Sequence, residues 1–217
     1  MWGVAVVLAT VLITIMCITS RWMVGEQYAQ TPAPVYIISL PHRQDRLHRC
    51  IEHNAIKDYT LVEAVDGRSL EKTQGLTAGE HGCFLSHIRA LQLIARGPHE
   101  RGLVLEDDAR LHIPADELVN MPMPPHTDMI SVGCHWFPKK PSDPKTSLFD
   151  LDFDLYGAHA IVYTREGAQK ILRTATLPPT QAYDIWVSRN KDVRKKVTWP
   201  PLADIFDVSD TDTQRIR

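Results

Sequence analysis

Three consecutive carboxylates, Glu106, Asp107 and Asp108, follow the apolar run of residues 102–105. Adjacent carboxylates repel one another, so in a folded domain they require a cation, a basic partner or open water. Carboxylate oxygens at the end of a buried strand can hold a hard divalent metal ion such as Mg²⁺ or Mn²⁺. The alternative is a buried strand that continues into a solvated acidic turn, and this stretch alone does not distinguish the two.

Two arginines, Arg43 and Arg46, follow the β-rich run of residues 35–40 and the proline that ends it. Open α/β sheets bind ligands beyond the carboxyl ends of their strands. Arginine at that edge can hold phosphate or carboxylate through two hydrogen bonds. A solvated helix start is the alternative for this pair. Together with a carboxylate-held metal, however, the two arginines would form the kind of edge that a nucleotide diphosphate requires.

The pattern of apolar residues predicts strands that alternate with helices. Thr77 and Glu80 form a capping box that begins a helix ending near Gly97, and Thr164 is placed to cap a later helix. The predicted strands cover residues 35–40, 60–65, 102–105, 129–133 and 157–163. This order predicts an α/β fold with a mostly parallel sheet flanked by helices, in which the acidic triplet and the two arginines share one edge.

A further acid, Asp184, lies among aromatic and aliphatic neighbours. A half-buried carboxylate of this kind could have a raised pKa and serve as a general base. The alternative is that Asp184 is the N-cap of a short helix. Cys83 and His87, one helical turn apart, could in principle share a metal, but the sequence contains no second ligand pair to accompany them.

Composition excludes some classes of protein. The formal net charge of −2, with acids and bases interspersed, does not fit a nucleic-acid binder, which would show a strong basic excess. The four cysteines form no CxxC pair, so we interpret them as buried thiols and not as a disulfide framework or a zinc knuckle.

The N-terminal residues predict a membrane anchor. Residues 2–20 contain no charged side chain and would span about 28 Å as a helix; a signal peptide is the alternative. We expect a linker over residues 21–34, a globular domain over 35–200 and a loosely ordered polar tail over 201–217. We expect a single-pass membrane protein with a lumenal domain, although Arg21 on the domain side argues slightly against that orientation.

Four segments resemble glycosyltransferase family 25, which includes lipooligosaccharide galactosyltransferases and collagen galactosyltransferase-like proteins. They are residues 37–46, 76–87, 104–108 and 157–163 with Gly167 and Ala168. The resemblance implies a GT-A type, Rossmann-like fold, a UDP-sugar donor, a bound Mn²⁺ or Mg²⁺ ion, and a glycan or glycoprotein acceptor.

The resemblance also implies roles for single residues. Asp108 would be a metal ligand, with Asp107 or Glu106 supporting the metal or contacting the nucleotide. Arg43 and Arg46 would approach the nucleotide. Asp184 would be the base or an acceptor contact.

The implied reaction is transfer of a hexose, galactose by family, to a hydroxyl group. Two other functions stay open at this point. One is a catalytically reduced, membrane-anchored module that binds a glycan or a protein. The other is a metal-dependent phosphohydrolase, which would require its leading acids at the end of the first strand, where the chain has Ser39-Leu40-Pro41.

Overall fold

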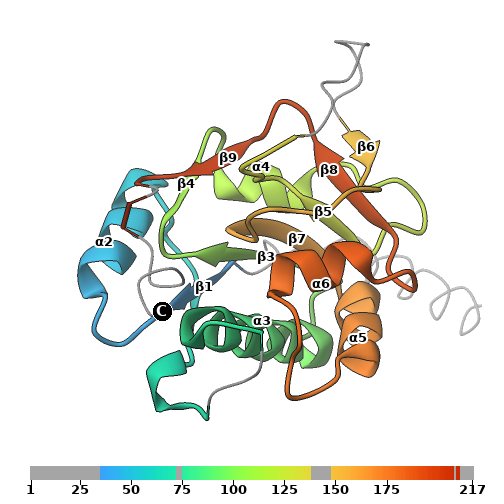
Figure 1. Cartoon of the computed structure of the whole chain (residues 1–217). Coiled ribbons are helices and arrows are strands. Elements are labelled where there is room, and N and C mark those ends of the chain that lie inside the picture. Colours follow the sequence, from blue (N-terminus) through green and yellow to red (C-terminus); the bar gives the residue numbers. More distant parts are fainter. Residues whose placement is uncertain (1–34, 72–74, 138–147, 208, 211–217) are drawn as a thin grey trace, which may run out of the picture. The chain divides into compact units, whose positions relative to one another are not determined.

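A mixed β-sheet forms the centre of the domain (Figure 1). The computed structural model describes residues 35–71, 75–137, 148–207 and 209–210. Within these residues, seven strands form the sheet in the order β2-β1-β3-β7-β5-β8-β6. Their bounds are Val35–Ser39 (β1), Thr60–Glu63 (β2), Arg101–Glu106 (β3), Met129–Ser131 (β5), Leu148–Asp150 (β6), Ala160–Thr164 (β7) and Lys195–Thr198 (β8). Five of these strands run in one direction, and only β7 and β6 oppose them. The predicted α/β fold with a mostly parallel sheet is confirmed.

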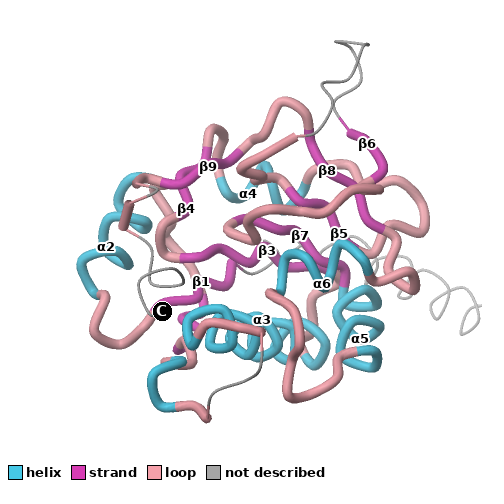
Figure 2. Tube along the Cα trace, viewed as in Figure 1, coloured by secondary structure: helices cyan, strands magenta, loops and turns pink. Residues whose placement is uncertain are grey.

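Helices cover both faces of this sheet (Figure 2). The helices are α2 (Gln44–His53), α3 (Ala78–Arg96), α4 (Ala115–Asn120), α5 (Arg165–Thr174) and α6 (Tyr183–Arg189). One apolar cluster joins the sheet to α3, α5 and α6, and a second joins it to α2 and α4. In β1, Tyr36 and Ile38 belong to the first cluster, while Val35 and Ile37 belong to the second. Because successive strand residues point to opposite faces, β1 carries apolar side chains on both faces from Val35 to Ile38.

The helix α3 begins where the capping box predicted it. The Thr77 hydroxyl accepts a hydrogen bond from the Glu80 backbone N–H at 3.1 Å, and the Glu80 carboxylate accepts one from the Thr77 N–H at 2.7 Å. Gly97 follows the last helical residue. A Cβ on Gly82 would lie 2.4 Å from the Val65 carbonyl oxygen. The absence of a side chain at Gly82 therefore lets α3 approach the loop after β2, which places both beside the predicted ligand edge.

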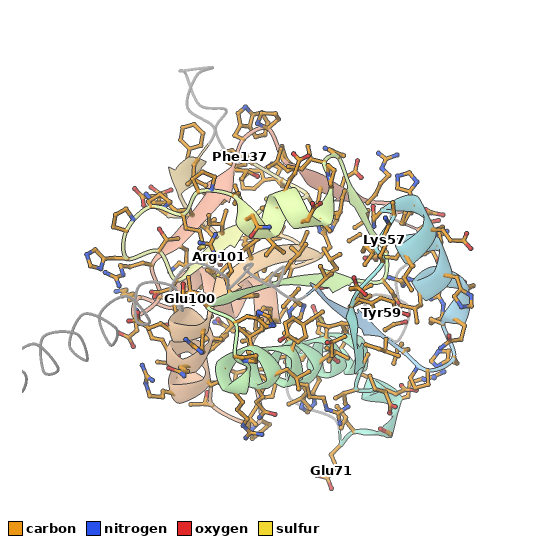
Figure 3. All side chains as sticks on the ribbon, turned by 180° about the vertical axis from the view of Figure 1, so that it is seen from behind. Lys57, Tyr59, Glu71, Glu100, Arg101 and Phe137 are labelled. Atoms are coloured by element: carbon orange, nitrogen blue, oxygen red, sulfur yellow. The ribbon has the colours of Figure 1, made fainter. Side chains whose placement is uncertain are left out.

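The edge of the sheet at β2 faces solvent. Tyr59 and Leu61 are 39% and 47% exposed, and Figure 3 shows Lys57 and Tyr59 in the connection that leads from α2 to this strand. A lysine near an edge strand disfavours pairing with another chain.

The described residues after Pro201 are part of the fold. Strand β9 (Ala203–Ile205) pairs antiparallel with β4 (Ala109–Leu111), directly after the acidic triplet. The prediction of a loosely ordered tail from residue 201 is therefore wrong for the described residues up to Asp210. The short segment Ala203-Asp204-Ile205 has too few residues for a strand pattern to be recognised in the sequence.

The predicted anchor over residues 2–20 and linker over 21–34 lie outside the described residues. Among the residues that are described, no helix is long and apolar enough to cross a membrane. The anchor and the lumenal location stay predictions.

Candidate functional site

An open pocket of about 270 Å³ lies at the carboxyl ends of β1, β2 and β3. Its wall includes the loop after β2 with the short 3₁₀ helix η1 (Gly67–Ser69), and residues of the first turns of α3. Of the residues predicted to form the site, those that line the pocket are Arg46, Glu106, Asp107 and Asp108. The predicted common edge therefore exists, because parallel strands end on the same side of a sheet.

Arg46 binds both aspartates of the triplet. Its Nη2 lies 2.6 Å from Asp107 Oδ1 and 2.7 Å from Asp108 Oδ2, and the arginine is only 4% exposed. The Ser39 hydroxyl donates a hydrogen bond to Asp107 Oδ2 at 2.7 Å. In this structure Arg46 thus pairs with both carboxylates that the sequence assigned to a metal.

The two aspartates have raised pKa values in spite of this arginine. Burial raises the pKa of Asp107 to about 6, although the Arg46 charge and the Ser39 hydrogen bond oppose the shift. Burial, followed by the charge of Glu106, raises the pKa of Asp108 to about 7, again against Arg46. Within the described residues, Asp108 Oδ1 is buried and has no hydrogen-bond partner. A buried carboxylate oxygen in this condition is suited to a divalent cation.

Arg43 lies outside the pocket lining and binds the C-terminal segment. Its Nη2 donates to both carboxylate oxygens of Asp210, at 2.9 and 2.8 Å. Arg46 also donates to the Asp210 carbonyl oxygen at 3.1 Å, and the Phe206 N–H donates to the Asp108 carbonyl oxygen at 3.0 Å. Sequence reasoning missed Asp210, because nothing local to that polar segment indicates a partner more than 160 residues away.

Glu106 points to the other face of the sheet, toward α3. Its Oε1 lies 3.1 Å from His87 Nε2 and 3.9 Å from Cys83 Sγ. Burial acts to raise the pKa of Glu106, but the His87 hydrogen bond, with the charges of His87, His159 and Arg46, more than offsets burial, so the pKa is lowered.

Cys83, His87 and Glu106 have ligand atoms within 4.8 Å of one another, a spacing that could hold a metal ion. The sequence had identified the first two but no further ligand, and β3 supplies it. However, burial and then the Glu106 charge raise the Cys83 pKa well above its ordinary value. In the metal-free chain this shift favours the protonated thiol, which is a weaker metal ligand than thiolate sulfur.

Asp184 is the second residue of α6, and Ala182 is the N-cap. The interpretation of Asp184 as the N-cap is wrong. Its Oδ2 accepts a hydrogen bond from the Gly157 N–H and its Oδ1 from the Ile185 N–H, both at 2.8 Å. Burial raises the pKa of Asp184, in the direction that a general base near neutral pH requires.

The sequence has relatives of known class. Residues 33–133 match the family model described as "Glycosyltransferase family 25 (LPS biosynthesis protein)". The chain is 36% identical over 100 residues to procollagen galactosyltransferase 1-A of Xenopus laevis, covering 36% of this chain and 16% of that protein. It is 28% identical over 174 residues to procollagen galactosyltransferase 1 of Danio rerio, covering 66% of this chain and 29% of that protein. The chain thus spans less than a third of either relative.

Solved structures give weaker likenesses. A Drosophila β-1,4-galactosyltransferase 7 mutant in complex with manganese, UDP-Gal and xylobiose has a TM-score of 0.46 and 9% identity, covering 84% of this chain and 75% of that chain. The A197 protein from STIV has a TM-score of 0.43 and 13% identity, covering 76% and 81%. Similarity at this level supports no argument about the site. The sequence match, by contrast, supports the resemblance read from the motifs: residues 33–133 match the model of glycosyltransferase family 25, and procollagen galactosyltransferases are among the similar proteins.

Proposed function

We propose that this chain transfers a hexose, galactose by its family, from a UDP-sugar to a hydroxyl group of a glycan or glycoprotein, with a divalent metal ion. The observation on which the proposal rests is the pocket at the ends of β1, β2 and β3, because it brings Arg46 together with Glu106, Asp107 and Asp108. The donor, the acceptor class and the GT-A assignment of the sheet rest on family membership.

Asp108 would hold Mn²⁺ or Mg²⁺ through its buried Oδ1, which accepts no hydrogen bond from the described residues. Asp107 would support the ion from the adjacent position, and Glu106 would contact the nucleotide. A divalent ion at this point stabilises negative charge on a departing diphosphate. The positive charge of Arg46 offsets the repulsion between the two buried aspartates. Arg43 would reach the diphosphate only by leaving Asp210.

Asp184 would act as the general base. In an inverting displacement, the acceptor oxygen forms a bond to the anomeric carbon, the bond from that carbon to UDP breaks, and the acceptor proton passes to the carboxylate. The raised pKa of Asp184 increases its affinity for that proton. Its hydrogen bonds to two backbone N–H groups would fix the direction of the carboxylate.

The test is release of UDP from UDP-galactose by the full chain, with and without Mn²⁺. We expect Asp108→Asn to lower the metal-dependent rate at least about tenfold, a loss of roughly 1.4 kcal/mol in transition-state stabilisation. Asp116→Asn changes an exposed acid on α4 and should leave the rate as it is. An unchanged rate for Asp108→Asn would show that the metal site is assigned wrongly.

A catalytically reduced binding module is the second candidate, and one observation favours it. Arg46 already satisfies an oxygen of each aspartate and Arg43 is bound to Asp210, so these charges are paired without a metal. Such a module would not turn over UDP-galactose with Mn²⁺ and would show no thermal shift with UDP and Mn²⁺. No observation favours the phosphohydrolase, since the end of β1 offers Ser39, which is bound to Asp107.

A further inference from the structure

Two helices hold the pocket carboxylate Glu106 through a buried pair of rings. His87 on α3 contacts Glu106 Oε1 through its Nε2 at 3.1 Å. The His87 ring is stacked on the ring of Tyr183, the first residue of α6, with centroids 4.2 Å apart and planes 7° apart. Both residues are 1% exposed. The pair lies outside the pocket lining, behind the carboxylate that it contacts.

Contacts on several sides fix these rings. The hydroxyl groups of Tyr183 and Tyr163 form a hydrogen bond at 2.8 Å, and Phe84 packs edge-on against Tyr183 with centroids 5.6 Å apart. Edge-to-face and offset-stacked pairs of this kind favour one mutual orientation. Because Tyr163 lies on β7 and Phe84 on α3, the stack is attached to the sheet as well as to both helices.

The hydrogen bond has a defined direction. An ionised carboxylate can only accept hydrogen bonds, so His87 donates through Nε2 to Glu106. Within the described residues, His87 Nδ1 is buried and has no hydrogen-bond partner. Among the described residues, no other polar group is hydrogen-bonded to the His87 ring. The stack on Tyr183 and the contact with Glu106 therefore orient the ring.

Glu106 is the point where this pair meets the pocket. Its side chain is 24% exposed and it lines the pocket, whereas the side chain of its partner His87 is 1% exposed. One oxygen of the Glu106 carboxylate therefore binds His87 on the side away from the pocket, while Glu106 itself lines the pocket. A site carboxylate whose rotamer is locked by a buried partner is pre-organised for its ligand.

We propose that His87 is a positioning residue that fixes the direction of the Glu106 carboxylate toward the nucleotide-sugar, and that Tyr183 positions His87. This inference deepens the function proposed above and rests on it. Tyr183 immediately precedes Asp184 on α6, so the same stack connects the placement of the donor-side carboxylate to that of the acceptor-side base. If the pair only filled the core, its replacement would change stability alone.

The experiment uses four variants of the full chain and one control variant. His87→Leu removes the donor, and His87→Gln restores an N–H group without the stacked ring. Tyr183→Leu removes the stack, and Tyr183→Phe keeps it while losing the hydroxyl bond to Tyr163. His48→Leu is the matched control, since His48 is exposed on α2. For each variant we would measure kcat and KM for metal-dependent hydrolysis of UDP-galactose, Kd for UDP with Mn²⁺ by calorimetry, and the melting temperature.

We expect His87→Leu to lower kcat at least tenfold per folded molecule and His87→Gln to recover part of that loss. Tyr183→Leu should have an intermediate effect, and Tyr183→Phe a smaller one because it keeps the stacked ring. His48→Leu should stay within threefold of wild type. A wild-type kcat for folded His87→Leu, with only its melting temperature lowered, would overturn the proposal.

A wild-type chain without metal-dependent hydrolysis would instead refute the proposed function. Binding of UDP with Mn²⁺ then decides the positioning role. A Kd for His87→Leu at least tenfold weaker than that of wild type, with partial recovery in His87→Gln, would support it. An equal Kd would overturn it.

Discussion

The two sides of the acidic triplet are held by different chemistry. Glu106 faces α3 and is bound by a histidine that is stacked on a tyrosine, and its pKa is lowered. Asp107 and Asp108 contact the guanidinium group of Arg46 on α2, and their pKa values are raised to about 6 and 7. Three consecutive carboxylates therefore behave as two separate sites.

The alternation of a strand explains this division. Val104 packs on the α3 side of the sheet, and Leu103 and Leu105 pack on the α2 side. Continuing the alternation puts Glu106 on the first side. The strand ends there, and Asp107 and Asp108 lie in the turn that follows, where both contact Arg46. Glu106 is held by a hydrogen bond to the buried His87, whereas Asp107 and Asp108 share one arginine. The aspartate side thus has negative charge left to be balanced, which is where a cation would contribute.

The largest effect is expected from removing the counter-charge on the aspartate side. Arg46→Met would leave two buried aspartates without their cation, which should lower the free energy of unfolding by about 3–5 kcal/mol in metal-free protein. Urea denaturation at pH 8 measures the loss, and added Mn²⁺ should recover part of it. Arg173→Met, at an exposed position on α5, should cost less than about 0.5 kcal/mol. Equal losses in the two variants would contradict the assignment of Arg46 as the counter-ion.

A pH series on metal-free protein tests the raised pKa values. In the folded chain the pKa values of Asp107 and Asp108 are about 6 and 7, above their ordinary value of 3.8. Between pH 3.8 and these raised values, the folded state therefore binds more protons than the unfolded state. Their contribution to stability is complete below about pH 4 and is lost as the pH rises through 6 and 7.

Asp108→Asn should remove part of this decline. At pH 8 without metal, we expect the variant to be more stable than wild type by at most about 4 kcal/mol, which is what a rise of the Asp108 pKa from 3.8 to about 7 corresponds to. Mn²⁺ should stabilise wild type only. An unchanged pH profile in the variant would locate the titration elsewhere.

The smallest effect is expected from replacing Asp210, the partner of Arg43. Asp210→Asn breaks the pair with Arg43, but the Asp210 side chain is 24% exposed, so the loss of stability should stay below about 1 kcal/mol. Binding of UDP should become tighter, because Arg43 no longer has to leave its ion pair with Asp210. Calorimetry with UDP measures this, with Asp192→Asn in an exposed turn as the control. Weaker binding would show that Asp210 supports the donor site and does not compete for Arg43.

Local sequence was sufficient for several elements, among them β3, α3 and α5, and for the acidic motif. The capping box of Thr77 and Glu80, the cap at Thr164 and the apolar run that ends at Glu106 each depend on neighbours within a few residues, and such neighbours fix helix starts and strand periods. The alternation of strands and helices then predicted a common edge for Arg43, Arg46 and the triplet. The pocket contains Arg46 and the triplet, whereas Arg43 lies outside its lining.

Tertiary structure decided what local patterns do not encode. The position of β7 between β3 and β5, antiparallel to both, depends on long-range pairing. The contact of Asp210 with Arg43 and the choice of His87 as the partner of Glu106 also depend on which surfaces pack together. Packing and charge compensation are properties of the assembled chain. The sequence by itself therefore determined which carboxylates stand at the site, and only the fold decided that one is held by a stacked histidine and two by an arginine.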